Sequence, residues 1–68
     1  MMISKQLSDE AILREVGERL ASARLARNLT QAALAQEAGI AKRTMERLEK
    51  GESAVRLSAL VRVCRTLD

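Results

Sequence analysis

The chain has 68 residues, of which 47% are hydrophobic, and it contains no Phe, Trp, Tyr or Pro. This length suits one domain near the lower limit of what folds unaided, with a core of aliphatic side chains. The net charge is +3, and the excess lies in residues 25–68, with eight cations and five anions, because residues 1–24 hold four of each. A basic excess confined to one part of a chain favours a polyanionic partner.

The composition also argues against several classes of function. With no His and a single Cys, Cys64, the chain lacks a Cys/His metal cluster, a nucleophile–base pair and an intrachain disulfide. We therefore expect no catalytic residue, no metal, no cofactor and no enzymatic activity. Because there is no signal peptide and no apolar run of about 18 residues, we expect a cytoplasmic protein that does not span a membrane.

The absence of Pro and of period-two alternation predicts an all-helical chain. Residues 1–7 carry no pattern, and we expect a flexible segment there, followed by a domain of residues 8–68. Ser8 is a good N-cap for the first helix. We expect this helix to end near Arg27, with Asn28 in the left-handed conformation that often follows a helix.

One face of the first helix is apolar at helical spacing, at Ile12, Val16, Leu20 and Ala23. Gly17 lies in the middle of the helix, where Gly costs up to about 1 kcal/mol relative to Ala. Two explanations stay open for this glycine: the close approach of another backbone, or simple tolerance.

The stretch from Thr30 to Gly51 holds two short helical patterns separated by a glycine. Thr30 is a good N-cap for the first of them, and Gly39 readily adopts the left-handed conformation that ends it. A second helix then begins near Ala41 and ends at Gly51. Apolar residues at helical spacing give the two helices their inner faces: Leu34, Ala35, Ala38, Met45 and Leu48. Two short helices joined by a tight turn that contains Gly form a helix-turn-helix.

The outer face of the second of these helices, about residues 42–50, is basic. By 3.6-residue spacing it carries four cations and one anion, namely Lys42, Arg43, Glu46, Arg47 and Lys50. Glu46 can either accept a hydrogen bond from cytosine N4 or balance Arg43, Arg47 and Lys50, and we favour the second role. A helix about 15 Å long fits the major groove of B-DNA, where Arg and Lys are suited to guanine O6 and N7. The alternative is an ordinary solvated helix face.

A last helix is predicted from its apolar residues. Its buried stripe is expected to comprise Leu57, Leu60, Cys64 and Leu67. Cys64 is then a small buried hydrophobic residue rather than a reactive thiol. We expect Ser58, Arg62 and Arg65 to point outward, whereas Val61 and Val63 flank the stripe and widen it.

Several residues match a known pattern: Arg24, Leu29-Thr30-Gln31, Leu34-Ala35, Gly39-Ile40, Leu48-Glu49 and Gly51. On these residues, the run from Val16 to Leu67 resembles the Cro-type (xenobiotic-response-element-like) phage-repressor family of helix-turn-helix DNA-binding domains. The resemblance implies an all-α fold, a compact repressor-like domain of four to five helices with its helix-turn-helix at about residues 30–51.

The resemblance also implies roles for single residues. Relatives read DNA bases with the positions of Lys42, Arg43 and Arg47, and they place Gln31, Thr44 and Lys50 at or beside phosphates. Glu49 falls toward the inner side of its helix, where an unpaired carboxylate is costly. Relatives pair this Glu with an Arg at the position of Arg24, so we expect a structural ion pair. The alternative is two ordinary surface charges.

The chain departs from the family at three places. At the base-reading positions relatives often have polar, uncharged residues, whereas this chain has Lys and Arg. Ala41 stands where relatives have a Ser or Thr N-cap, so we expect the helix that follows it to be weakly capped. Relatives have a fifth helix that helps to form the dimer, whereas this sequence stops at Asp68. Either the chain is part of a longer protein or the dimer forms differently. The candidate dimer surface comprises Val61, Val63 and Leu67, together with Leu13 or the N-terminal segment.

These features together predict a sequence-specific regulator of transcription that binds double-stranded DNA as a homodimer, most simply a repressor. Two alternatives stay open. One is the antitoxin of a toxin–antitoxin pair, which adds a toxin as a protein partner. The other is a helical protein-interaction module that has kept the fold but lost DNA binding.

Overall fold

Four helices make up the part of the chain that this computed structural model describes, residues 8–68. They are α1 (Asp9–Ala26), α2 (Gln31–Ala38), α3 (Lys42–Lys50) and α4 (Leu57–Leu67). Residues 8–68 contain no strand, so the predicted all-α fold with a central helix-turn-helix, α2 and α3, is confirmed. The segment predicted to be flexible, residues 1–7, lies outside the described residues. Within residues 8–68, no helix combines the length and the apolar character needed to cross a membrane.

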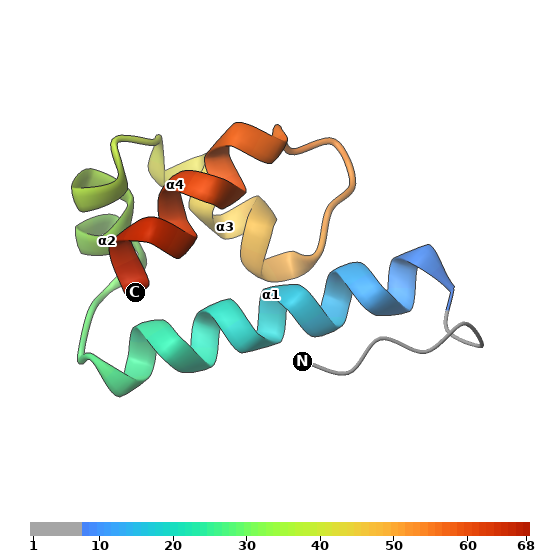
Figure 1. Cartoon of the computed structure of the whole chain (residues 1–68), viewed down its shortest axis with the longest axis horizontal. Coiled ribbons are helices and arrows are strands. Elements are labelled where there is room, and N and C mark those ends of the chain that lie inside the picture. Colours follow the sequence, from blue (N-terminus) through green and yellow to red (C-terminus); the bar gives the residue numbers. More distant parts are fainter. Residues whose placement is uncertain (1–7) are drawn as a thin grey trace.

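The longest helix, α1, runs along one edge of the molecule in Figure 1, and the other three helices lie together on one side of it. α3 packs against both α1 and α2, and α4 packs mainly against α2. The C-terminal end of α1 is tied to that of α4, because Arg27 Nη1 donates a hydrogen bond to the Thr66 carbonyl oxygen at 2.9 Å. α3 is therefore held between α1 and α2, with one side left open to solvent.

Side-chain caps fix the beginnings of the first two helices. Ser8 Oγ accepts a hydrogen bond from the backbone N–H of Ala11 at 3.2 Å, and Thr30 Oγ1 accepts one from Ala33 at 3.0 Å. Both predicted N-caps are thereby confirmed. α3 begins after Ala41 with no side-chain cap, as the sequence predicts.

The first three helices all end in left-handed residues, namely Asn28 (φ 57°), Gly39 (φ 74°) and Gly51 (φ 79°). Paired backbone hydrogen bonds close each of these ends. After α2, for example, Gly39 N–H donates to Gln36 O at 3.2 Å and Ile40 N–H donates to Ala35 O at 3.0 Å. These pairs satisfy carbonyl groups that have no partner within the helix. The chain therefore turns sharply at the positions that the sequence predicts.

The core consists of aliphatic side chains from all four helices. The completely buried side chains are Leu34 of α2, Met45 of α3 and Val63 of α4. Around them lie five further buried residues: Leu20, Ala35, Ala38, Leu48 and Ala59. The predicted inner faces of α2 and α3 are therefore confirmed.

The predicted apolar face of α1 is wrong at one position. Leu20 is buried and Ile12 and Val16 are partly buried, but Ala23 is exposed. The side chain that continues the inner face is that of Arg24, which is only 12% exposed. Arg24 lies one full turn beyond Leu20, so its charged side chain takes the place that the apolar pattern assigned to Ala23.

The predicted buried stripe of α4 is also wrong in its rotation about the helix axis. Leu57 is 73% exposed and Cys64 is exposed, whereas Ala59 and Val63 are buried and Leu60 and Leu67 are partly buried. Apolar residues cover most of the circumference of α4, so spacing alone cannot select the buried side. Packing on α2 selects the side with Ala59 and Val63.

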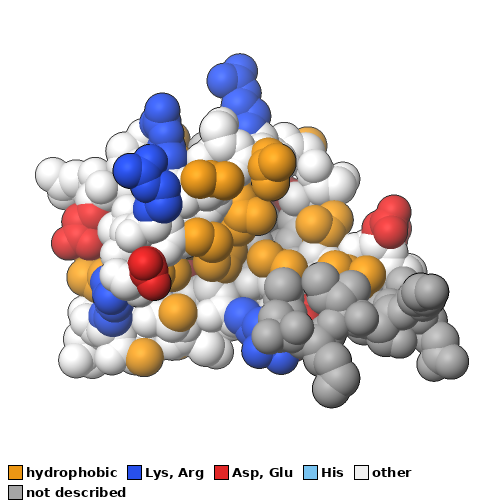
Figure 2. All heavy atoms as spheres, in the orientation of Figure 1, with side chains coloured by type: hydrophobic (Ala, Val, Ile, Leu, Met, Phe, Trp, Pro, Cys, Tyr) orange, Lys and Arg blue, Asp and Glu red, His pale blue; other side chains and the backbone are white. Residues whose placement is uncertain are grey.

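This rotation leaves apolar side chains of α4 at the surface. Leu57 and Val61 are both exposed, and a shallow apolar groove runs over Leu60, Val61 and Cys64. Figure 2 shows apolar side chains gathered over α4 at the centre of the visible face. Ser58, Arg62 and Arg65 are exposed, as predicted.

Candidate nucleic-acid interface

α3 lies against α1 at unusually short range. A Cβ atom added to Gly17 of α1 would lie 2.7 Å from the carbonyl oxygen of Leu48 and nearer still to that of Glu49. No side chain fits at such a distance, so the close approach of another backbone explains this mid-helix glycine. Of the two explanations left open by the sequence, the structure supports this one.

The end of α3 meets α1 in the same way. A Cβ atom added to Gly51 would lie 2.7 Å from the backbone nitrogen and Cα of Arg14. Gly51 also has a positive φ of 79°, which side chains disfavour. Two glycines, one on each side of the contact, therefore allow the last turn of α3 to rest on the backbone of α1.

The structure brings Arg24 of α1 and Glu49 of α3 together in a bidentate ion pair. Arg24 Nε donates to Glu49 Oε2 at 2.7 Å, and Arg24 Nη2 donates to Glu49 Oε1 at 3.1 Å. Their side chains are only 12% and 8% exposed. Arg24 Nη1 also donates to the carbonyl oxygen of Leu29 at 2.7 Å, in the connection between α1 and α2. One guanidinium group thus joins α1, the α1–α2 connection and α3.

Gln31, expected at a DNA phosphate, belongs to this same network. Its Nε2 donates to Glu49 Oε1 at 3.0 Å. The Glu49 carboxylate therefore accepts three hydrogen bonds, from Arg24 and Gln31. Sequence reasoning missed the contact between Gln31 and Glu49, because no local spacing relates the first residue of α2 to the end of α3. A side-chain amide carries two N–H groups, so one remains for another acceptor.

The opposite side of α3 carries the predicted cations. Met45 and Leu48 are buried, and four cationic residues are exposed on the helix: Lys42, Arg43, Arg47 and Lys50. They fall within nine residues, which at about 1.5 Å per residue make a helix of roughly 13 Å. The structure therefore gathers the predicted cations in one strip along the exposed side of α3.

Two of these cations lie near carboxylates. Lys42 Nζ is 3.9 Å from Glu46 Oε1, and Arg47 Nε is 3.4 Å from Glu52 Oε2. Both pairs are well exposed, so each contributes at most about 1 kcal/mol. Glu46 was expected to balance Arg43, Arg47 and Lys50, but the cation with which it forms an ion pair is Lys42. Neither of the other two cations of the strip, Arg43 and Lys50, forms an ion pair with a residue in 8–68.

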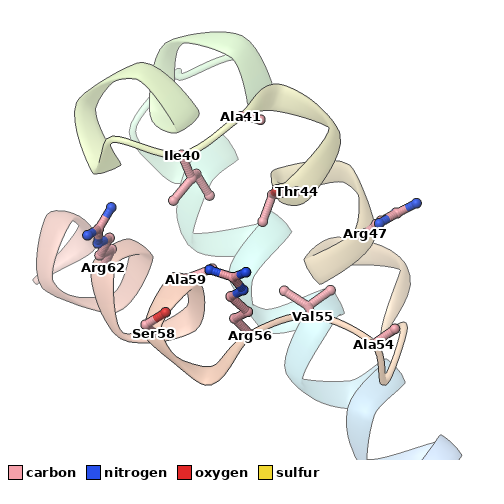
Figure 3. Close-up of a pocket in the computed structure, with 10 residues that line it drawn as sticks. All are labelled: Ile40, Ala41, Thr44, Arg47, Ala54, Val55, Arg56, Ser58, Ala59 and Arg62. Carbon is pink, nitrogen blue, oxygen red and sulfur yellow. The ribbon is translucent and has the colours of Figure 1, made fainter.

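Thr44, the remaining residue expected beside a phosphate, is half-buried and stands apart from the strip of cations. It faces a pocket between the beginnings of α3 and α4, where Figure 3 shows it opposite Ala59 and Val55. Gln31, Thr44 and Lys50 therefore lie at the start of α2, near the start of α3 and at the end of α3. The structure does not bring these three residues into one site. Thr44 and Lys50 belong to α3, and Gln31 lies beside the end of α3, where it contacts Glu49.

Comparison with models of known protein families agrees with this geometry. No curated protein is similar enough to this chain to count as a match. A family model described as a helix-turn-helix domain matches residues 15–68, which include all of α2, α3 and α4 and most of α1. The chain belongs to this family of helix-turn-helix domains.

Proposed function

We propose that this protein is a sequence-specific regulator of transcription that binds double-stranded DNA and reads the major groove with α3. Membership of the helix-turn-helix family supports DNA binding, because the second helix of this motif enters the major groove. The observation that carries the proposal is the strip of four exposed cations on α3, opposite the buried Met45 and Leu48. A strip of this kind supplies both phosphate attraction and guanine recognition.

Base reading is assigned to Lys42, Arg43 and Arg47. A division among them follows from their ion pairs: Lys42 and Arg47 each form one with a carboxylate, whereas Arg43 forms none with another residue in 8–68. We therefore propose Arg43 as the main guanine-reading residue, since an Arg that is not held in an ion pair can place both donors on O6 and N7. Gln31, Thr44 and Lys50 are assigned to phosphates, which fix the position of the protein but carry no sequence information.

The protein is proposed to act as a dimeric repressor of the Cro type. A dimer would read two half-sites about 34–36 Å apart on one face of the duplex and block the polymerase sterically. The exposed apolar side of α4, with Leu57 and Val61, is the proposed contact between the two copies. Val63 was expected on that surface, but it is completely buried and takes no part in it.

The exposed side of α4 also favours a second reading. A partner protein, such as the toxin of a toxin–antitoxin pair, would use the same apolar surface, formed by Leu57, Val61 and Cys64. The two readings predict different oligomeric states for the purified protein in the absence of a partner. A homodimer forms without a partner, whereas an antitoxin that uses this surface for its toxin stays monomeric until the toxin is added.

Selection from a pool of random duplexes tests the proposed function. We expect repeated rounds to enrich one sequence with two-fold symmetry and with half-site centres 10–10.5 base pairs apart. Each half-site should contain guanine, because the helix presents two arginines among its base-reading residues. A pool that remains random after several rounds, at near-physiological salt, would refute sequence-specific recognition.

A further inference from the structure

The two ends of α3 are held in place in different ways. Its last turn rests on the backbone of α1 at Gly17, and Glu49 accepts hydrogen bonds from Arg24 and Gln31. Its beginning has neither kind of support, because α3 starts after Ala41 without a side-chain cap. A pocket of about 370 Å³ lies between the beginnings of α3 and α4, so these two helices do not pack tightly there. The position of the first turn of α3 therefore depends on the connection that leads into it.

A side chain of α4 bonds to this connection, residues 39–41. Arg62 Nη1 donates to the carbonyl oxygen of Gly39 at 3.2 Å, and Figure 3 shows the Arg62 side chain extending from α4 toward the connection. The N–H groups of Gly39 and Ile40 donate to carbonyl groups of α2 and so fasten the connection to that helix. Arg62 therefore provides a hydrogen bond that links the connection to a helix outside the helix-turn-helix.

The bonded carbonyl group belongs to the residue at which the chain has most conformational freedom. Gly39 has a φ of 74°, and glycine adopts more backbone conformations than any other residue. A hydrogen bond to its carbonyl oxygen restricts the rotation of the peptide unit that leads to Ile40. The donor is a charged guanidinium, which forms stronger hydrogen bonds than a neutral group, and Arg62 forms no ion pair with another residue in 8–68. The direction in which the chain leaves Gly39 is thus set partly from α4.

We propose that Arg62 is a positioning residue for base reading by α3. Lys42 and Arg43 are the first two residues of α3 and follow Gly39 closely, so the direction of the chain at Gly39 determines where their side chains lie. Groups that recognise a ligand must be held within about 0.5 Å of the productive geometry. Arg62 acts through the connection and does not itself contact DNA. The inference rests on the proposed function, because it assumes that Arg43 reads guanine.

The first arm of the test measures the ratio of the affinities for the selected duplex and for a scrambled duplex, by anisotropy. Arg62→Met keeps the aliphatic part of the side chain and removes its donors. The control Arg65→Met removes the same charge from the same helix, at an exposed residue that does not bond to Gly39. Arg62→Met should lower the ratio about three- to tenfold, the effect of one hydrogen bond, whereas Arg65→Met should keep the wild-type ratio. Both variants should bind the scrambled duplex equally, because each lacks one charge.

The second arm measures amide hydrogen exchange in the full chain without DNA. The N–H of Met45 donates to the Ala41 carbonyl oxygen at 3.2 Å, which is the first hydrogen bond within α3. A looser connection should open this bond more often, so we expect Met45 to exchange about three- to tenfold faster in Arg62→Met. Leu48, nearer the end held by α1, should exchange as in the wild type. Circular dichroism at rising temperature establishes that both variants are folded.

The inference requires both results. A wild-type affinity ratio in Arg62→Met would overturn it, and so would a loss of affinity for both duplexes alike that exceeds that of Arg65→Met, because Arg62 would then contact phosphate. A lower ratio with unchanged exchange of Met45, or with equally faster exchange of Met45 and Leu48, would also overturn it.

The two arms also separate this inference from the proposed function. A wild type that prefers the selected duplex supports the proposed function even if Arg62→Met behaves as the wild type does. A wild type that prefers no duplex refutes the proposed function, and the role of Arg62 in base reading fails with it. Faster exchange of Met45 alone would then still show that Arg62 positions the beginning of α3, and unchanged exchange would exclude that as well.

Discussion

Gly17 of α1 and Glu49 of α3 meet through their backbones, so closely that a Cβ atom at residue 17 would overlap the Glu49 carbonyl oxygen. Through its side chain, the same Glu49 accepts hydrogen bonds from Arg24, which lies about two helical turns beyond Gly17 on α1. α3 is thus fixed on α1 by a steric requirement and by a charged hydrogen-bond network within its last turn. The exposed strip of cations on α3 depends on both for its orientation.

Replacing Gly17 with Ala should destabilise the protein. Ala is favoured over Gly in a helix by about 1 kcal/mol, but the clash with the carbonyl groups of Leu48 and Glu49 forces α1 and α3 apart. We expect a net loss of about 1–2 kcal/mol in the free energy of unfolding, measured by urea denaturation. The control is Ser22→Ala, at an exposed position of the same helix, which should leave stability unchanged or slightly raised. A Gly17→Ala protein as stable as the wild type would contradict the close packing of these helices.

Replacing Glu49 with Gln should lower the free energy of unfolding more than replacing any exposed carboxylate does. The change leaves the nearly buried Arg24 without a charged partner, and breaking such a pair costs about 3–5 kcal/mol. The matched control is Glu15→Gln, which removes one member of the exposed pair with Arg19 at 2.8 Å and should cost less than about 0.5 kcal/mol. A double-mutant cycle with Arg24→Gln should show strong coupling. Equal effects of Glu49→Gln and Glu15→Gln would show that the network does not hold α3 in place.

Val61 and Val63 test the rotation of α4 about its axis. Val63 is completely buried, so Val63→Ala removes core contacts and should cost about 2 kcal/mol in the free energy of unfolding. Val61 is 48% exposed, so Val61→Ala should change stability by less than about 0.5 kcal/mol. Thermal or urea unfolding of the two variants measures both effects. The reverse order would contradict the rotation of α4 about its axis that the structure shows.

Val61→Glu tests the proposed dimer surface. A charge on the exposed apolar side of α4 should weaken the contact between copies and leave the core unaffected, because the residue lies at the surface. Sedimentation equilibrium should show a dimer for the wild type and a monomer for Val61→Glu, with unchanged helix content by circular dichroism. If the variant sediments as the wild-type dimer does, the contact lies elsewhere. A monomeric wild type would favour the antitoxin reading.

The sequence predicts the helices well because their ends are set by local chemistry. Ser8 and Thr30 cap the helices that follow them, and Asn28, Gly39 and Gly51 end those that precede them. Each of these signals acts within about four residues, so no tertiary information is needed to read it. The inner face of α3 is equally readable, since Met45 and Leu48 make only one side of this helix apolar.

The sequence is less informative where contacts between residues far apart in the sequence determine which side chains are buried or bonded. α4 is apolar around most of its circumference, so only its contact with α2 determines that Val63 is buried and Cys64 exposed. The hydrogen bond from Gln31 to Glu49 joins residues 18 positions apart, and no periodicity indicates it. The pocket between α3 and α4 likewise depends on how two helix ends converge.

The central claim is that α3 reads DNA sequence, and one measurement tests it directly. A labelled duplex carrying the selected sequence and a scrambled duplex of equal length are titrated with wild type, Arg43→Ala, Lys50→Ala and the control Arg19→Ala, with binding followed by anisotropy. We expect Arg43→Ala to abolish the preference for the selected duplex, at a cost of about 1–3 kcal/mol in specific binding. Lys50→Ala should weaken binding to both duplexes alike, and Arg19→Ala, on α1, should change neither. A wild type that binds both duplexes equally, or an Arg43→Ala variant that keeps the full preference, would contradict the role assigned to α3.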